Sequence, residues 1–314
     1  MGQCGPSLGR LTRQVATPLV LLAAGMARRY GGCKPLAPIG PNGEAVIDLV
    51  ANDAVAAGFD RIVLVLHPET GPAIRYHVEQ CWPEWVDVVY AEQRLPLGTV
   101  HAVLAARASV APSPSFAVAN ADDVYGQEAM GLLADQLGTS TGEHALVAYQ
   151  LRATVATDDP VTRGICEVER RGYLAALVER RLVTRRDDGE FFSSEDGLEP
   201  ATLSGDLPTS VNLWGFQSSI WDVLQGAMDD SGLDEGALAV AVAAGGDAPK
   251  AEVLLPEVVA AMVAKDAGLP VRVIPTDARS LGVTHAADRT AVSAELARQV
   301  AWGIRPSSLW SEAG

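Results

Sequence analysis

The sequence predicts an α/β fold in which helices cover a doubly wound, mostly parallel sheet of the Rossmann-like kind. Short apolar runs typical of buried parallel strands occur at residues 19–24, 61–67 and 86–91. Segments with apolar residues at helical spacing separate these runs, at residues 44–58 and 71–81. Because strands and helices alternate, we expect parallel strands joined by right-handed crossovers.

Charge is distributed unevenly along the chain. The formal net charge is −15 over 314 residues, yet the first acidic residue is Glu44. The cations that precede it are Arg10, Arg13, Arg28, Arg29 and Lys34. A basic segment on an acidic protein suits a small polyanion, whereas the acidic balance argues against nucleic acid or a membrane surface as a partner. Four scattered cysteines without a C-x-x-C pair argue against disulfides or a zinc site and predict a cytoplasmic protein.

The loop after the first apolar run is the strongest functional feature. It places Gly31 and Gly32 among Arg28, Arg29 and Lys34. Ligands of open α/β sheets bind at the carboxyl ends of the strands, where glycines let backbone N–H groups approach a phosphate. Lys34 is one of only three lysines, and a lysine is a compact point charge. The loop predicts a triphosphate site, with an ordinary Arg/Gly surface loop as the alternative.

The segment from Leu19 to Leu36 resembles the signature of the sugar-1-phosphate nucleotidyltransferases, L-x-A-G-x-G-[ST]-R-x(4)-K-x-L. The matching residues are Leu22, Ala24, Gly25, Arg29, Lys34 and Leu36. The segment is most similar to a bacterial branch with the pattern LAAG-x-G-S-R-Y-G-G-x-K. Ala27 stands for the second glycine of that pattern, and Arg28 for its small hydroxyl residue.

The resemblance assigns roles to this loop. It implies that Arg29 binds the leaving β- and γ-phosphates and that Lys34 stabilises the charge on the α-phosphate. It also implies nucleotide contacts from Ala24, Gly25, Met26, Ala27 and Arg28.

Residues 91–107 predict a strand end, a turn and a helix that starts at Thr99. A glutamine side chain and a glycine backbone at such a place can read the edge of a nucleobase. The stretch resembles the base-binding segment of the family, with Gln93, Gly98 and Thr99 at the matched positions; the alternative is an ordinary strand–turn–helix. Gln93 is compatible with uracil or thymine, so UTP or dTTP is the favoured donor, with GTP or CTP also possible.

A second polar centre follows the strand predicted at residues 116–119. Asn120, Asp122 and Asp123 come at its carboxyl end, on the same sheet edge as the glycine-containing loop. Mg²⁺ prefers carboxylate oxygens and usually takes only one or two from a protein, although a helix cap or turn is the alternative. The resemblance implies that Asp122 holds Mg²⁺, that Asp123 supports or caps it, and that Asn120 contacts the nucleotide.

The pattern changes after a helix predicted at residues 127–138 and a strand at 145–154. Alternation in period two over residues 161–186 predicts an antiparallel hairpin region. This region resembles the R-G-x-C-E-V and V-x-E-[RK] segments of the family, and residues 209–217 resemble its V-N-x-x-W-G-F strand. The implied sugar-phosphate-binding residues are Gly164, Glu167, Glu179, Arg180 and Asn212. For Arg180, a solvated hairpin position is an equal alternative.

The remaining segments leave two alternatives open. Residues 186–207 are acidic and irregular, and they predict either a flexible lid or a disordered insertion. Residues 250–265 predict a helix broken near Pro256. By resemblance Glu252 is a candidate second metal ligand or sugar contact, and Glu257 is its rival.

The domain organisation follows from these motifs. We expect a loose tail over residues 1–16 and one domain over residues 17–314. Its nucleotide half spans about 17–150 and its sugar-phosphate half about 151–290, with a strand predicted at 271–276 within the latter. A final helix over 287–303 is a candidate contact in a homo-oligomer.

Together, the motifs predict Mg²⁺-assisted, in-line transfer of a nucleotidyl group from an NTP to a sugar 1-phosphate, giving an NDP-sugar and pyrophosphate. One alternative is another phosphorylated acceptor, such as a cyclitol phosphate. Another is a non-catalytic regulatory homologue, which remains an alternative because Ala27 and Arg28 depart from the family signature. A dinucleotide dehydrogenase is excluded, because no G-x-G-x-x-G follows the first strand.

Overall fold

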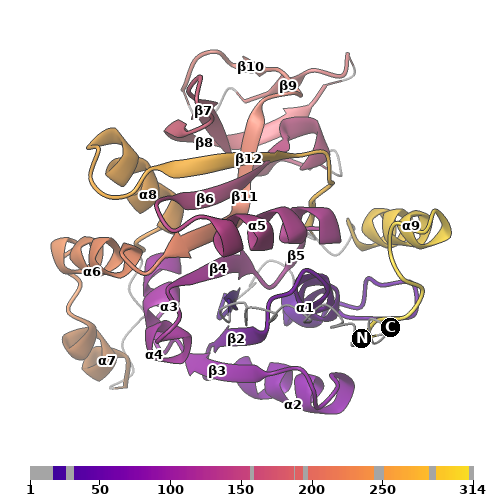
Figure 1. Ribbon diagram of the computed structural model, residues 1–314, viewed down its shortest axis with the longest axis horizontal. Helices are drawn as coiled ribbons and strands as arrows, with labels where there is room; N and C mark the ends of the chain where they lie inside the picture. Colours follow the sequence, from indigo (N-terminus) through magenta and orange to yellow (C-terminus); the bar gives the residue numbers. More distant parts are fainter. Residues whose placement is uncertain are drawn as a thin grey trace, which may run out of the picture.

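A computed structural model of the chain (Figure 1) shows a mixed α/β fold built on one large sheet. Among the helices that it describes, none is long and apolar enough to cross a membrane. The structure describes residues 17–25, 32–155, 159–186, 188–193, 197–243, 251–282 and 288–310. The predicted tail over residues 1–16 lies outside these ranges.

The first part of the sheet is parallel, as the sequence predicts. Its strands lie in the order β3, β2, β1 and β4, and each pairs with its neighbours in parallel register. They are almost fully apolar because helices cover both of their faces. The bounds are β1 Pro18–Ala23, β2 Arg61–Leu66, β3 Val88–Glu92 and β4 Ser115–Asn120.

The second part is mostly antiparallel and continues the same sheet. β11 (Pro208–Gln217) pairs with β4, β6 and β7 in antiparallel orientation, and β12 (Val271–Thr276) runs parallel to β6. Together, β7 and β8 form the hairpin predicted from the alternation in period two. The further strands are β5 Asp123–Val124, β6 His144–Gln150, β7 Val161–Val168, β8 Leu174–Arg185, β9 Phe191–Phe192, β10 Thr202–Leu203 and β13 Leu281–Gly282.

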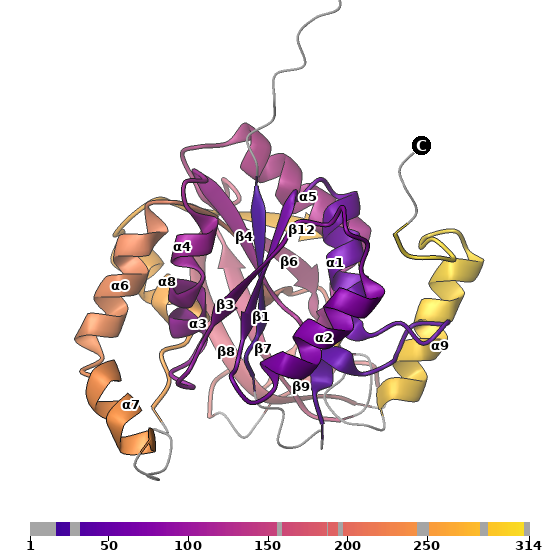
Figure 2. The same ribbon diagram turned by 90° about the horizontal axis from the view of Figure 1, so that it is seen from below.

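Two layers of helices bury the two faces of the sheet. Figure 2 shows α1, α2, α5 and α9 on one side and α3, α4, α6 and α8 on the other, and each set packs on its own apolar core. The helix bounds are α1 Val46–Ala56, α2 Gly71–Cys81, α3 Thr99–Ala105, α4 Arg107–Val110, α5 Gln127–Thr139, α6 Ile220–Asp230, α7 Glu235–Ala243, α8 Leu255–Ala264 and α9 Asp288–Ala301, with short 3-10 turns at Lys34–Leu36 and Leu151–Ala153. The arrangement is the doubly wound class that the sequence predicts.

Most predicted elements shift by a few residues at their ends, and two differ more in their bounds. The strand expected over residues 145–154 ends at Gln150, and a 3-10 turn follows. The helix expected to break near Pro256 instead begins at Leu255, because proline is well tolerated in the first turn, where no helical N–H bond is lost. Leu254 is extended, so no helix runs through it.

The described part of residues 186–207 folds back on the hairpin. β9 pairs with β8, and β10 pairs with β9. Phe191 and Leu203 are buried in a small third core with Val161 and Val183. The segment is therefore an extension of the sheet where the structure describes it.

A buried ion pair ties the C-terminal segment to α1. Both guanidinium NH groups of Arg305 donate to the carboxylate of Asp53, over 2.9 and 2.6 Å, and the two side chains are 4% and 0% exposed. Burial raises the pKa of Asp53, and the Arg305 charge opposes that rise. Removing one partner leaves a buried charge uncompensated.

We therefore expect Asp53→Ala to lower the free energy of unfolding by about 3 kcal/mol, measured by chemical denaturation. Asp60→Ala, which removes an exposed carboxylate just after α1, is the matched control and should change stability by less than about 0.5 kcal/mol. Equal effects from the two variants would contradict the role of the pair.

Candidate active site

The carboxyl ends of β1 and β4 lie side by side and bring two predicted motifs together. Leu22 pairs with Asn120, and the backbone N–H of Ala121 donates to the carbonyl of Leu22. The predicted nucleotide residues Ala24 and Gly25 follow directly on β1. The predicted contacts at Met26, Ala27, Arg28 and Arg29 lie outside the described residues.

Lys34 and Asp122 form the central polar pair of this edge. Lys34 Nζ donates to Asp122 Oδ2 over 2.6 Å, although the residues are 88 positions apart in the sequence. The side chains are 16% and 30% exposed, so the pair faces a partly open space. Burial alone would lower the pKa of Lys34, but the carboxylates of Asp122, Asp123 and Asp288 raise it above its ordinary value. Lys34 is thus a fixed positive charge.

Asp123 lies next to Asp122 and lines a cavity. Its carboxylate accepts a hydrogen bond of 2.9 Å from Asn120 Nδ2. Burial and the neighbouring Asp122 raise the pKa of Asp123, while Lys34, Asn120 and Arg163 lower it. Tyr125 holds the turn at Asn120–Asp123 in place. Its hydroxyl accepts a hydrogen bond from the backbone N–H of Asn120 and donates one to the carbonyl of Val211 in β11.

A cavity of about 210 Å³ opens beside Asp123, between the two parts of the sheet. It contains four of the predicted site residues: Asn120, Gly164, Glu179 and Asn212. The rest of its lining is Asp123, Thr162, Arg163, Leu177, Ser210, Val211, Pro256 and Glu257. The cavity therefore unites the Asn120–Asp123 turn, the β7–β8 hairpin, β11 and the start of α8.

Local backbone geometry explains two of these positions. Asn212 has φ +63°, a left-handed conformation that asparagine adopts more readily than most residues. Its Oδ1 accepts from Trp214 Nε1 over 3.2 Å, which fixes the amide at the cavity. A Cβ at Gly164 would lie 3.0 Å from Leu177 Cδ1 and 3.4 Å from Ser210 Cβ, so glycine keeps β7 close to its neighbours.

Arg180 and Glu167 lie away from the cavity. Arg180 is 4% exposed, and its guanidinium donates to the carbonyls of Ser193, Leu198 and Pro200. It thereby fastens the segment after β9 to the hairpin rather than lining the cavity. Glu167 is exposed near the end of β7. The fold therefore does not bring these two predicted sugar-phosphate residues to the other three, Gly164, Glu179 and Asn212.

Glu257, rather than Glu252, reaches the cavity. Two backbone hydrogen bonds of Val253 explain why: its N–H donates to the Leu97 carbonyl, and its carbonyl accepts from the Val100 N–H. This extended pairing leaves Glu252 exposed, while the helix that starts at Leu255 carries Glu257 to the cavity wall.

Arg163 is a cavity residue that the motif comparison missed. It donates from Nε to Thr154 Oγ1 over 3.0 Å, and burial lowers the pKa of its guanidinium while Asp123 raises it. Arg163 immediately precedes Gly164 and is the arginine of the matched R-G segment. That match was the sequence signal from which its place in the cavity could have been predicted. Thr162 and Ser210 carried no comparable signal.

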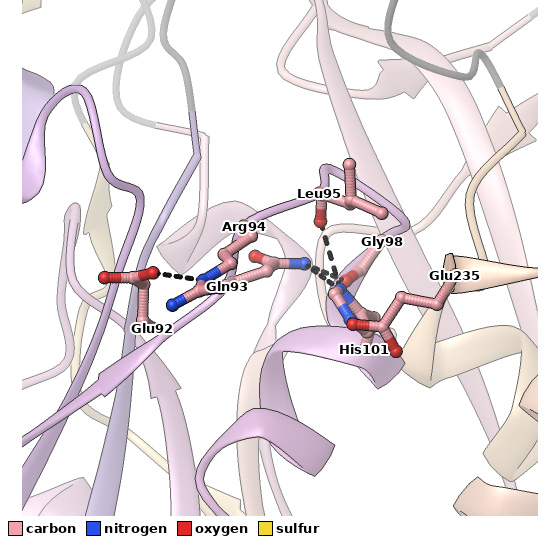
Figure 3. Close-up of polar contacts among 7 residues, drawn as sticks. All are labelled: Glu92, Gln93, Arg94, Leu95, Gly98, His101 and Glu235. Atoms are coloured by element: carbon pink, nitrogen blue, oxygen red, sulfur yellow. Dashed lines mark hydrogen bonds and ion pairs between the residues drawn. The ribbon is translucent and has the colours of Figure 1, made fainter. Parts of the chain in front are cut away.

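The predicted base-binding segment lies on the same sheet edge (Figure 3). Gln93 follows directly on β3, and its backbone N–H donates to the carbonyl of Leu66, the last residue of β2. Its side-chain Nε2 donates to the Gly98 carbonyl over 3.0 Å. Thr99 Oγ1 accepts from the backbone N–H of Leu255 over 2.7 Å, which docks the start of α8 on this segment.

Comparison with protein families decides the identity of the fold. The family model described as the MobA-like NTP transferase domain matches residues 19–234, which is more than half of the chain. The chain belongs to this family. The predicted membership of the nucleotidyltransferase superfamily is confirmed, and the protein is a nucleotidyltransferase. The narrower bacterial branch stays a prediction.

One solved structure supports the same fold. The chain is similar to a UDP-glucose pyrophosphorylase from Acinetobacter baumanii, with 16% sequence identity and a TM-score of 0.60. The match covers 94% of this chain and 95% of that chain. A search of curated proteins by sequence finds no match.

In this nucleotidyltransferase, the polar edge fits a magnesium ion bound largely through its substrate. Within the described residues, no group of three or more His, Cys, Asp or Glu side chains could form an all-protein metal cage. Mg²⁺ does not require one, because it usually takes one or two carboxylates and completes its shell with phosphates and water. Asp122 and the adjacent Asp123, which are both only partly buried, are such a donor set.

Gly98 offers a sharp test of the base segment. Its φ is +96°, and a Cβ there would collide with the Val253 carbonyl and lie 2.6 Å from the Val253 nitrogen. Gly58 has nearly the same φ, +97°, but nothing within 4 Å of the added Cβ. Comparing substitutions at Gly98 and Gly58 therefore separates the steric displacement of Val253 from the cost of backbone strain.

We expect Gly58→Ala to cost about 1 kcal/mol of stability and to leave nucleotide affinity unchanged. Gly98→Ala should cost more and also weaken NTP binding at least about tenfold, because it displaces the extended segment at Val253 that leads into α8. Denaturation and nucleotide titration measure the two effects. Equal nucleotide affinity in the two variants would contradict the assignment of this segment.

Proposed function

We propose that this protein transfers a nucleotidyl group from a nucleoside triphosphate to a sugar 1-phosphate. An oxygen of the acceptor phosphate attacks the α-phosphorus in line and forms a new P–O bond. The bond between the α-phosphorus and the oxygen that links it to the β-phosphorus breaks, and pyrophosphate leaves with the bonding electrons. No side chain becomes covalently attached, so catalysis consists of positioning and charge stabilisation.

The observation that carries this proposal is the junction at the end of β4. Asp122 pairs with Lys34 on the nucleotide edge, while the adjacent Asp123 and its partner Asn120 line the cavity. A phosphate bound in the cavity would thus lie next to the edge where the α-phosphate is proposed to bind. Adjacency of this kind is what direct transfer between two bound substrates requires.

The proposed roles follow from position and charge. Lys34 stabilises the negative charge that builds up on the α-phosphate, and Asp122 is the candidate ligand of Mg²⁺. When bound, Mg²⁺ would supply charge neutralisation on the phosphate oxygens. Arg29 keeps the role implied by the resemblance, binding of the β- and γ-phosphates.

The cavity suits a polyhydroxylated phosphate ester. Carboxylates of Asp123, Glu179 and Glu257 can accept hydrogen bonds from hydroxyl groups, and Arg163 supplies positive charge near the phosphate. A cyclitol phosphate offers the same groups as a sugar phosphate. It is therefore the second candidate acceptor.

Gln93 at the end of β3 is the proposed base contact, and UTP or dTTP is the favoured donor. The similar structure is named for a uracil nucleotide, which supports the same choice.

The test is pyrophosphate release with Mg²⁺ from UTP, dTTP, GTP and CTP, each combined with glucose 1-phosphate, other hexose 1-phosphates and inositol phosphates. Release that requires both an NTP and a sugar 1-phosphate is the expected result. Release only with a cyclitol phosphate would replace the proposed acceptor. No release with any pair, despite a melting-temperature shift caused by an NTP, would instead indicate a regulatory homologue.

A further inference from the structure

Helix α8 receives its N-terminal cap from a different helix. Leu254, the residue before α8, has an apolar side chain that cannot accept a hydrogen bond from the first turn. The acceptor is instead Oγ1 of Thr99, the first residue of α3, which lies 2.7 Å from the backbone nitrogen of Leu255. Because Thr99 and Leu255 are 156 positions apart, the cap depends on how α3 and α8 meet in the fold.

Backbone hydrogen bonds reinforce this contact. The Val253 N–H donates to the Leu97 carbonyl over 2.9 Å, and the Val100 N–H donates to the Val253 carbonyl over 3.1 Å. Gly98, beside Leu97, leaves no room for a side chain against Val253. Figure 3 shows the Gln93 amide directed at the Gly98 carbonyl. The segment proposed to bind the base and the segment leading into α8 are therefore one hydrogen-bonded unit.

The first turn of α8 also carries a residue of the cavity wall. Glu257 lines the cavity of about 210 Å³ together with Pro256. Its side chain is exposed and, within the part of the chain that the structure describes, forms no hydrogen bond or ion pair. The backbone of this turn therefore sets where the Glu257 carboxylate lies.

Few hydrogen bonds hold that turn in place. The first N–H groups of a helix have no partner within the helix itself. Pro256 has no N–H, and the first N–H of α8 that bonds back along the helix is that of Val258. The bond from Leu255 to Thr99 is thus a principal restraint on the turn that carries Glu257. Later turns of α8 are held by the apolar core.

We infer that Thr99 is a positioning residue for the acceptor substrate, because its hydroxyl caps α8 and thereby fixes Glu257 at the cavity. Thr99 belongs to the segment proposed to bind the base, yet its Oγ1 acts on the acceptor side. The inference rests on the proposed function for the place of the acceptor in the cavity. Loss of this bond should therefore weaken acceptor binding and leave the transfer step itself unchanged.

Thr99→Val tests the cap, because it keeps the shape of the side chain and replaces the hydroxyl by a methyl group. Thr99→Ser keeps the hydroxyl and is the rescue variant. Thr70→Val is the matched control, since Thr70 Oγ1 is buried but has no hydrogen-bond partner among the described residues.

Three measurements compare these variants. Pyrophosphate release gives kcat, KM for UTP and KM for the hexose 1-phosphate or inositol phosphate that supports the fastest release. Titration calorimetry gives the dissociation constants of UTP and of the same hexose 1-phosphates and inositol phosphates. Hydrogen exchange over residues 253–262 reports directly on the first turn of α8.

Thr99→Val should raise KM and the dissociation constant for the acceptor about fivefold, the effect of about one lost helix cap. We expect KM for UTP and kcat to change less than about twofold, and hydrogen exchange at the start of α8 to become faster. Thr99→Ser and Thr70→Val should keep wild-type values. A merely structural role would lower stability without this difference between the two substrates.

Glu257→Ala supplies the second test, through a double-mutant cycle. If Thr99 acts through Glu257, Thr99→Val should raise the acceptor KM by less than about twofold once Glu257 is replaced. A further fivefold rise in that background would overturn the inference. An unchanged acceptor KM in the single variant Thr99→Val would overturn it as well.

Failure of this inference can be told apart from failure of the proposed function. Wild-type turnover with an unchanged acceptor KM in Thr99→Val refutes the inference alone. Acceptor binding without any pyrophosphate release, weakened about fivefold by Thr99→Val, supports the inference and refutes transfer. If none of the acceptors binds to the wild type, both are refuted.

Discussion

Replacing Lys34 by alanine is expected to lower kcat at least about a thousandfold while the protein stays folded. The Lys34 ammonium is a fixed cation, 2.6 Å from Asp122 and raised in pKa by three carboxylates. Alanine removes the charge that would stabilise the α-phosphate in the transition state but not in the ground state, so kcat should fall more than NTP affinity. Steady-state pyrophosphate release and nucleotide titration measure the two quantities.

Lys265→Ala is the matched control, because Lys265 is exposed at the end of α8 and lies outside the cavity lining. It should keep wild-type kcat. Thermal unfolding confirms that both variants are folded. If Lys34→Ala turned over at a rate near that of the wild type, the role assigned to Lys34 would be wrong.

Asp122→Asn should lower kcat by at least about a hundredfold and weaken Mg²⁺ binding in the presence of nucleotide. The amide keeps the shape of the side chain but removes the anion that pairs with Lys34 and is proposed to bind the metal. Because the Asp122 charge raises the pKa of both Lys34 and Asp123, its loss should also move both pKa values downward. The second readout does not depend on turnover.

Asp87→Asn serves as the control for charge, since Asp87 forms an exposed ion pair with Arg61 on the surface. Calorimetry should show that the stabilisation of the protein by Mg²⁺ with NTP is lost in Asp122→Asn and kept in Asp87→Asn. If Asp122→Asn kept the metal-dependent stabilisation, Asp122 would not be the ligand of Mg²⁺.

The parallel half of the fold was predictable because its signals are local. Apolar runs and helical spacing between residues 18 and 81 define β1, α1, β2 and α2 without reference to the rest of the chain. The Lys34–Asp122 contact was also within reach, because both residues follow parallel strands and such strands end at one edge. Neighbouring strand ends bring distant residues together by topology alone.

The acceptor half was less predictable because distant contacts decide it. Alternation in period two predicts on which face of the hairpin Arg180 lies. It does not predict that the carbonyls of Ser193, Leu198 and Pro200 accept hydrogen bonds from its guanidinium. Likewise, the choice of Glu257 over Glu252 depends on the pairing of Val253 with Leu97, more than 150 residues away in sequence.

The most direct test of nucleotidyl transfer follows labelled phosphorus. The protein is incubated with Mg²⁺, a sugar 1-phosphate and an NTP labelled either at the α- or at the γ-phosphate, and the products are separated. The α-label should appear in an NDP-sugar and the γ-label in pyrophosphate, both only when the acceptor is present. An α-label found in free nucleoside monophosphate, or a γ-label found in orthophosphate or on the sugar, would contradict transfer through the α-phosphorus.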